Sequence, residues 1–506
     1  MAPSIGGTWY WYRYPGAMSD TESYLYRYSW DLHDLQSYPW PRRCLSQSEI
    51  LAYLQHIVER HGLDRFIRCG VEMLSATWNE GAARWSVLTS VGETVSARYL
   101  IQSLGVLSQP HYPLIPGTEH FAGKIVHTSR WPNNLPLKDS ESASSGRLDC
   151  GQRLVSGDER HKINQDYADI WDRVRNSYVG FGIKDSGSKA TEATVAEREA
   201  AFREAWDHGN GFHFMFGAYG DLVTNKEANN AACGFLRCQI ADLVKDTRKD
   251  ALLTPSDSYA RRPVCNSGYY PIFNQPKVDV VSVAETPIAQ IVPQGVEMAD
   301  GKVHKLDVLV FATGYDAVEG NYNRVKIAGV DGQTLSQHWA DGPTAYGAVA
   351  CAGFPAHSRS SRLLLSELEL IMACIDAAEQ GCDEAKVVTE ALQDAETSWS
   401  ETCLRVAKAT LFWVTRNWIF GVNVLGREPK ANFYLGGLGA YRAWTHEPNM
   451  VVNSSYKLLH LLADSDNRLR GLRKLSDSLQ QDGSESIMHV AAYDTDAVFA
   501  SNGHID

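Results

Sequence analysis

The sequence predicts an α/β protein in which short strands alternate with longer amphipathic helices. Residues 306–311 form a nearly continuous apolar run, followed by Ala-Thr-Gly at 312–314, as expected of a buried parallel strand. Segments 167–247 and 359–418 carry apolar residues at the helical intervals of three and four. With 506 residues, of which 44% are hydrophobic, the chain is long enough for two or three domains with a sizeable core.

The elements of the first third are a helix and two strands. Residues 1–44 are dense in aromatic residues and in Gly/Pro turns. A helix is expected over 46–58, because the apolar residues there repeat at helical spacing. Strands are expected at 85–88 and 98–102. Residues 133–166 are polar and show neither period, so a loop or disorder is expected.

In the rest of the chain, the sequence predicts two strands, with a helical segment before and after them. The strands are expected at 278–283 and 306–311, between the helical segments 167–247 and 359–418. The last thirty residues are polar, and we expect them to be frayed.

Composition narrows the class of partner and the compartment. A net charge of −12 argues against nucleic acid, which needs a basic face. No run of eighteen apolar residues occurs, so no membrane span is expected. The start lacks the basic and apolar regions of a secretory signal, and the ten cysteines show no CxxC pairs, which favours the cytoplasm. A small molecule is the expected partner; the sequence does not indicate the oligomeric state.

Three motifs carry the chemistry. The first is GGTWYWYRYPG at 6–16, followed by SDTESYLY at 19–26. The second is Phe-x-Gly-x-x-x-His-Thr-x-x-Trp-Pro at 121–132, and the third is FATGYD at 311–316. Further short matches follow in the same order as in one known family, at 175–177, 262–274 and 418–423.

These motifs closely resemble those of the Baeyer–Villiger flavin monooxygenases, and the chain is identified as a member of that family. The resemblance implies a Rossmann-like fold with two dinucleotide-binding domains, FAD and NADPH as cofactors, and oxygen insertion beside a ketone carbonyl. A terpenoid or polyketide substrate in secondary metabolism is implied too. The implied domains are 1–132, the N-terminal part of the FAD domain; 133–315, an NADPH-domain remnant with a helical insertion at 167–258; and 316–506, the rest of the FAD domain and a tail.

The resemblance also implies roles for single residues. Arg262 resembles the active-site arginine beside the flavin, where a fixed guanidinium stabilises negative charge that develops during oxygen activation. Asp20 matches the carboxylate that pairs with it. Arg261 stands where the family places a cation near the nicotinamide cofactor's phosphate, and Trp418 resembles a tryptophan near the nicotinamide and the substrate. The remaining matches belong to the flavin-wrapping loop: Thr8, Trp9, Tyr10, Trp11, Thr21 and Tyr26.

Each assignment has a structural alternative. Asp20 and Arg262 would, without the family context, be read as a structural ion pair. The single tryptophans would be read as core residues. His127 is expected to be a buried, hydrogen-bonded histidine at a domain hinge.

The sequence departs from the family at the phosphate-binding segments, so an incomplete fold is expected. Only five residues precede Gly6, too few for the first strand, Gly-x-Gly-x-x-Gly turn and helix. Residues 133–166 lack the glycine triplet of the second such unit, and after 352–355 the family's Gly-Pro turn is missing. Losing two or three phosphate contacts forfeits roughly 4–8 kcal/mol of binding, so weakened flavin binding is expected.

Three functions therefore stay open. The first is a flavin- and NADPH-dependent monooxygenase. The second is a cofactor-free cyclase or isomerase, in which Arg262 and Asp20 polarise a carbonyl and the cavity holds the substrate in a reactive conformation. The third is a non-catalytic remnant, which includes an incomplete gene model.

Overall fold

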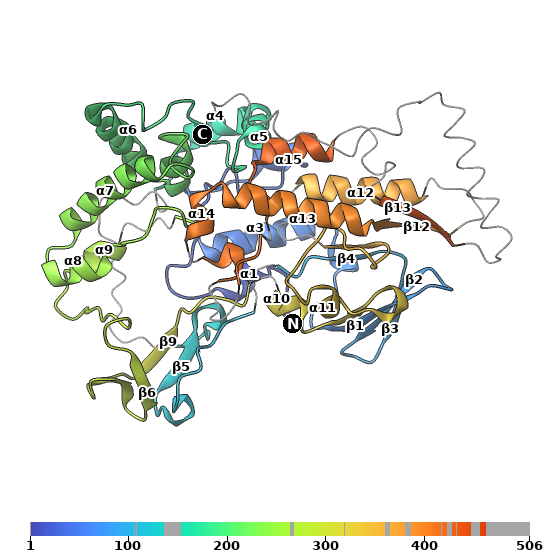
Figure 1. Cartoon of the computed structure of the whole chain (residues 1–506), viewed down its shortest axis with the longest axis horizontal. Coiled ribbons are helices and arrows are strands. Elements are labelled where there is room, and N and C mark those ends of the chain that lie inside the picture. The colour runs from blue at the N-terminus through green and yellow to red at the C-terminus, as the bar shows by residue number, and fades with distance from the viewer. Residues whose placement is uncertain are drawn as a thin grey trace.

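The computed structural model describes residues 2–105, 107, 109–135, 153–263, 268–317, 319–359, 365–379, 386–415, 417–422, 428–431, 433–446 and 456–461. Helices and short strands alternate along the chain, so the predicted α/β class is confirmed. Helices of the middle of the chain gather at one end of the molecule, and most of the strands lie in small sheets below the C-terminal helices, while residues 386–391 and 456–461 form strands beside those helices (Figure 1).

The largest described sheet has the strand order β10-β1-β2-β3. It consists of β1 (Met73–Asn79), β2 (Arg84–Thr89), β3 (Thr94–Ala97) and β10 (Lys326–Ala328). The first three strands form an antiparallel meander, and β10 pairs parallel to β1. Trp85 is fully buried and packs with Trp78 and Phe354 in the core beneath this sheet. The strand predicted at 85–88 is confirmed as part of β2.

Two further sheets are parallel pairs of strands that lie far apart in the sequence. β4 (Leu100–Gln102) pairs with β11 (His357–Arg359), and β5 (Lys124–His127) pairs with β9 (Val308–Phe311). The strands predicted at 98–102 and 306–311 are thus confirmed, the second as a parallel strand. Its expected full burial is wrong: Val310 is 41% exposed, because β9 has only one neighbour among the described strands.

The other described sheets are antiparallel. β6 (Ile288–Val292), β7 (Gly295–Met298) and β8 (Val303–Lys305) form one, and β12 (Lys386–Ala391) with β13 (Tyr456–Leu461) forms another. β12 interrupts the segment predicted to be helical. Its run of β-branched residues favours an extended chain, and β13, distant in sequence, supplies the partner.

The predicted N-terminal helix is confirmed as α3 (Gln47–Arg60). Ser46 and Glu49 form a capping box at its start, which satisfies two backbone N–H groups. Ile50, Tyr53 and Ile57 form its buried face. The shorter helices α1 (Thr8–Trp11) and α2 (Leu32–Ser37) lie before it.

The helices predicted over 167–247 are confirmed. They are α5 (Tyr167–Asn176), α6 (Val195–His208), a π-helical turn η4 (His213–Gly217) and α7 (Lys226–Leu243), with α8 (Thr247–Leu253) and α9 (Tyr269–Ile272) following. The loop predicted at 133–166 is wrong where α4 (Gly157–Gln165) forms. The Ser156 side chain caps this polar helix, and Ile163 anchors it on a buried cluster with Trp40 and Leu45. Residues 136–152 of that prediction lie outside the described residues.

The strand predicted at 278–283 is wrong, because its backbone oxygens bond to side chains of α8. The Lys249 Nζ donates to the carbonyl oxygens of Val278 at 2.7 Å and Phe273 at 2.8 Å. Arg248 donates to the carbonyl of Val280 at 3.1 Å. These bonds replace the strand ladder that the valine pattern indicated.

The C-terminal helices are confirmed apart from the β12 interruption. They are α12 (Leu365–Glu379), α13 (Gln393–Lys408) and α14 (Leu411–Val414), with α10 (Glu319–Tyr322) and α11 (Leu335–His338) before and α15 (Leu438–Thr445) after them. Short 3-10 turns are η1 (Asp64–Phe66), η2 (Thr118–His120), η3 (Thr128–Arg130), η5 (Val330–Gly332) and η6 (Trp418–Phe420). The tail predicted to be frayed lies outside the described residues. Within the described ranges, no helix has both the length and the apolar composition that crossing a bilayer requires.

Candidate active site

The three sequence motifs meet at α1. This helix packs against both α3 and η3, the turn that directly follows β5. The guanidinium of Arg130 lies 4.5 Å from the centre of the Trp11 ring, which joins the first motif to the second. Tyr12 stacks on Tyr315 with ring centroids 5.8 Å apart, which joins the first motif to the third.

The aromatic residues of the first motif are held by polar bonds as well as by packing. The Trp9 indole N–H donates to the Tyr26 hydroxyl at 2.6 Å, and the two rings meet edge to face at 5.7 Å. The Gln47 side chain donates to the backbone oxygen of Trp9, which ties α1 to the start of α3. Burial raises the pKa of Tyr26, so its hydroxyl is neutral near pH 7.

Asp20 and Arg262 form an ion pair beside these aromatic residues. The Arg262 Nη2 lies 2.7 and 3.0 Å from the two carboxylate oxygens of Asp20. The Arg262 side chain is 40% exposed and that of Asp20 is 26% exposed. The charges of both act on the Tyr26 hydroxyl, and the Phe212 ring lies 5.6 Å from the guanidinium. The pairing that the resemblance implies is therefore present, while the catalytic roles remain predictions.

The other predicted residues occupy different surroundings. Thr8 is exposed at the start of α1, and Tyr10 meets Trp11 edge to face at 5.0 Å. The backbone N–H of Thr21 is bonded by the Ser19 hydroxyl. Trp418 lies in η6 and packs edge-on against Phe433 at 5.8 Å. The guanidinium of Arg261 bonds to Asp257, four residues earlier.

A buried polar network links the motifs, and only His127 among its members was predicted from the sequence to be buried and hydrogen-bonded. His127 is 1% exposed and bonds through Nδ1 to the Ser129 hydroxyl at 2.8 Å, so the prediction of a buried, hydrogen-bonded histidine is confirmed. Burial lowers the pKa of His127. Ser129 also bonds to Tyr315, which bonds to Tyr12, whose hydroxyl donates to the carbonyl of Leu107 at 2.9 Å. Burial raises the pKa of Tyr12 far above its usual range. The positions of Tyr12 and Tyr315 inside two motifs were the available signal.

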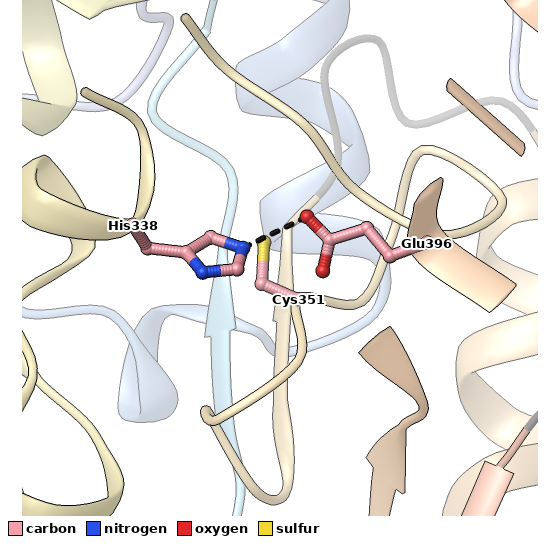
Figure 2. A group of neighbouring side chains, drawn as sticks. All are labelled: His338, Cys351 and Glu396. Atoms are coloured by element: carbon pink, nitrogen blue, oxygen red, sulfur yellow. Dashed lines mark hydrogen bonds and ion pairs between the residues drawn. The ribbon is translucent and has the colours of Figure 1, made fainter. Parts of the chain in front are cut away.

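A second polar cluster, His338, Cys351 and Glu396, was missed by the sequence analysis (Figure 2). Its ligand atoms lie within 4.8 Å of one another, as in a metal site. Their bonds, however, are made within the protein. Glu396 accepts from the His338 Nε2 at 2.8 Å and from the Ala352 N–H at 2.6 Å, and also from the Thr344 hydroxyl. The arrangement is a closed network that holds α11 and α13 to residues 344–352, which follow α11.

The chain is similar to several known monooxygenases. No family model matches the chain. A phenazine N-monooxygenase from Lysobacter antibioticus is 39% identical, over 91% of this chain and 91% of the relative. A Baeyer–Villiger monooxygenase from Pseudooceanicola batsensis is 35% identical, over 87% of each chain.

Solved structures extend the likeness to three dimensions. A cyclohexanone monooxygenase from a Rhodococcus species, bound to NADP+, superposes with a TM-score of 0.86 at 38% identity, over 91% of this chain and 93% of that one. The chain belongs to the Baeyer–Villiger flavin monooxygenase family. The predicted family and its Rossmann-like fold are confirmed. Another solved relative, a complex with FAD and NADP, has a TM-score of 0.81 at 25% identity, over 90% and 93% of the two chains.

The described residues suit the flavin ring of FAD but not its phosphates. The aromatic residues around α1 and the Asp20–Arg262 pair suit a flat ring that gains negative charge during reaction. Dinucleotide phosphates need a strand, a glycine-rich turn and a helix N-terminus. No Gly-x-Gly-x-x-Gly occurs in the sequence, and no described parallel strand runs through such a turn into a helix. The residues therefore fit the flavin ring, whereas a phosphate cradle is not among them.

Proposed function

We propose that this chain is a monooxygenase that uses FAD and NADPH to insert one oxygen atom beside the carbonyl of a ketone. The observation that carries the proposal is the Asp20–Arg262 pair beside the aromatic residues of α1, in a chain with 38% identity to a cyclohexanone monooxygenase. The flavin, when bound, supplies the oxygen-activating chemistry.

The Asp20–Arg262 pair suits a charge-stabilising role because Asp20 holds the guanidinium in place while the Arg262 side chain remains exposed to solvent. Both carboxylate oxygens of Asp20 accept from the Arg262 Nη2, which anchors one end of the guanidinium. The side chain stays 40% exposed, so a substrate oxygen can approach it. A guanidinium keeps its charge at every working pH and needs no movement to stabilise an oxyanion. We propose Arg262 as catalytic and Asp20 as the residue that orients it.

The proposed cofactor contacts are those of the sequence analysis. Trp9 and Tyr26 support each other through their hydrogen bond, and both lie at the motif junction. Arg261 remains the proposed contact of the nicotinamide cofactor's phosphate. The other proposed contacts are Thr8, Tyr10, Trp11, Asp20, Thr21 and Trp418.

The substrate class and the setting are proposals as well. Ketones of terpenoid or polyketide type in secondary metabolism are favoured by the family. The cysteine pattern favours the cytoplasm. A heteroaromatic nitrogen is the second candidate for the oxygen acceptor, because the 39% identical relative is a phenazine N-monooxygenase.

Oxygen transfer with a panel of substrates tests the proposal. The purified chain is supplied with FAD and NADPH, and oxygen uptake and products are followed with cyclic ketones, a terpenoid ketone and phenazine. Lactone or ester formation supports ketone oxygenation, and an N-oxide alone would select the second candidate. Substrate conversion by colourless protein without NADPH would instead support a cofactor-free cyclase or isomerase.

A further inference from the structure

We propose that this chain binds NADPH weakly and with little preference over NADH, because the sequence has no Gly-x-Gly-x-x-Gly turn and the described residues form no site for the cofactor's phosphates. The inference rests on the proposed function, since it concerns how that reaction obtains its electrons. Four features of the chain lead to it.

The first feature is the β5–β9 sheet. Its two strands pair in parallel from Lys124 opposite Val308 to His127 opposite Phe311. Parallel strands that hold a dinucleotide lie inside a wider sheet with helices over both faces. Here Val310 is 41% exposed, and β5 and β9 are the only described strands of the sheet. Among the described residues, the sheet therefore has no neighbouring strand whose end would point at a pyrophosphate.

The second feature is the sequence between the second motif and the next helix. In the family that this chain resembles, the phosphate-binding unit follows the Trp-Pro pair. Residues 133–156 separate Pro132 from α4, and they contain no Gly-x-Gly-x-x-Gly turn that would lead from a strand into that helix. Gly146 and Gly151 are the only glycines among them.

The third feature is the charge at the start of α4. A helix N-terminus attracts phosphate when it is uncharged, but the first turn of α4 carries Asp158 and Glu159. Ser156 already caps the Glu159 N–H at 3.1 Å. Arg153 pairs with the Glu159 carboxylate at 2.6 and 3.0 Å, and that bond lowers the pKa of Glu159, which keeps it ionised. A phosphate would meet two carboxylates there.

The fourth feature is the ion pair that Arg261 forms with Asp257. The proposed phosphate contact already bonds to Asp257, and its side chain is 50% exposed. An exposed arginine that shares its charge with a neighbouring carboxylate adds little affinity for a phosphate. Discrimination between NADPH and NADH depends on binding the additional phosphate, so we expect little of it.

A glycine-rich turn would supply several charge-assisted bonds to the phosphates, and each such bond contributes about tenfold or more to affinity. The combined expectation is a loss of roughly a thousandfold, which moves a micromolar dissociation constant to the millimolar range.

Calorimetric titration of the full chain with NADP+ and NAD+ tests this directly, without any need for activity. The NADP+-binding cyclohexanone monooxygenase of Rhodococcus serves as the positive control. We expect no saturation by either nucleotide below about 1 mM, and dissociation constants within about threefold of each other. Saturation by NADP+ below about 100 µM, or a preference above tenfold, would overturn the inference.

A second measurement separates this inference from the proposed function. Flavin supplied to the chain is reduced with dithionite under nitrogen and then mixed with oxygen and a ketone. The two electrons of the reduced flavin and two protons balance the reaction, in which one oxygen atom enters the product and the other leaves as water. Product formation together with unsaturable NADP+ supports both ideas. No product in this arm contradicts the proposed function, whereas tight NADP+ binding contradicts only the inference.

Discussion

The pairs Asp20–Arg262 and His338–Glu396 each join a carboxylate to a nitrogen-containing side chain from a distant part of the chain, but they differ in solvent exposure. In the first pair the side chains are 26% and 40% exposed, and it lies beside the aromatic motif residues. In the second they are 7% and 1% exposed. Both oxygens of Glu396 are occupied by donors from the protein.

This difference separates a structural pair from a candidate catalytic one. A buried, fully bonded carboxylate holds elements together, and its removal leaves its partners without bonds in a low-dielectric core. A half-exposed, oriented guanidinium contributes little to stability but can meet a substrate. Residue type alone would have favoured His338, Cys351 and Glu396 as a metal site. The bonds of the cluster decide against that interpretation.

The largest expected effect is on stability, in Glu396→Ala. Removing this carboxylate leaves His338, Thr344 and the Ala352 N–H without their partner, so we expect a loss of about 3–5 kcal/mol in the free energy of unfolding. Urea denaturation measures it. Glu401→Ala, an exposed change on the same helix, is the control and should alter stability by under about 0.5 kcal/mol. Equal effects in the two variants would contradict the closed network.

Arg262→Ala should show the opposite pattern. We expect a loss of about a hundredfold to a thousandfold in oxygenation rate, with the melting temperature almost unchanged, because the pair is half exposed. Product formation from dithionite-reduced flavin measures the rate without involving NADPH. Arg68→Ala removes an exposed arginine from its pair with Glu93 and should leave the rate unchanged. Full activity of Arg262→Ala would show that the assignment is wrong.

A smaller effect concerns pH. Burial by itself raises the pKa of Glu396, but hydrogen bonds from His338, Ala352 and Thr344 outweigh it and hold the folded-state pKa below the ordinary 4.5. The stabilisation is therefore present above the unfolded-state pKa and is lost as the pH falls through the folded-state value. We expect the difference in unfolding free energy between the wild type and Glu396→Gln to shrink below about pH 4. A difference that is the same at pH 7 and pH 3 would contradict this account.

The smallest effect is on nucleotide affinity. Asp257→Ala releases Arg261, so NADP+ binding should strengthen several-fold while NAD+ binding stays the same. Calorimetric titration with both nucleotides measures the change. Glu59→Ala removes the same charge from an exposed position on α3 and controls for net charge. If Asp257→Ala left NADP+ binding unchanged, Arg261 would not contact the phosphate.

The local parts of the fold were predictable from the sequence, and the parts that depend on distant partners were not. The α3 helix follows from its periodicity, and its capping box is encoded within four residues. The strand expected at 278–283 does not form because Lys249 and Arg248 bind carbonyl oxygens 29 and 32 residues further along the chain. β12 was missed because its partner β13 lies far along the chain.

The candidate site shows the same division. The residue types in the motifs, and the resemblance they carry, indicated Asp20 and Arg262 as partners. The network from His127 to Tyr12 was not indicated, since its bonds join three motifs that only folding brings together.

The sequence by itself determined the family, the α/β class, the helices with strong periodicity and the lack of a Gly-x-Gly-x-x-Gly turn after Pro132, because each of these is a property of neighbouring residues or of their order. The tertiary structure alone decided that the Glu396 carboxylate is buried, that Arg262 remains accessible and that β9 has one neighbour among the described strands. Burial and hydrogen-bond satisfaction depend on residues that are hundreds of positions apart, as Asp20 and Arg262 are, and no local pattern contains that information.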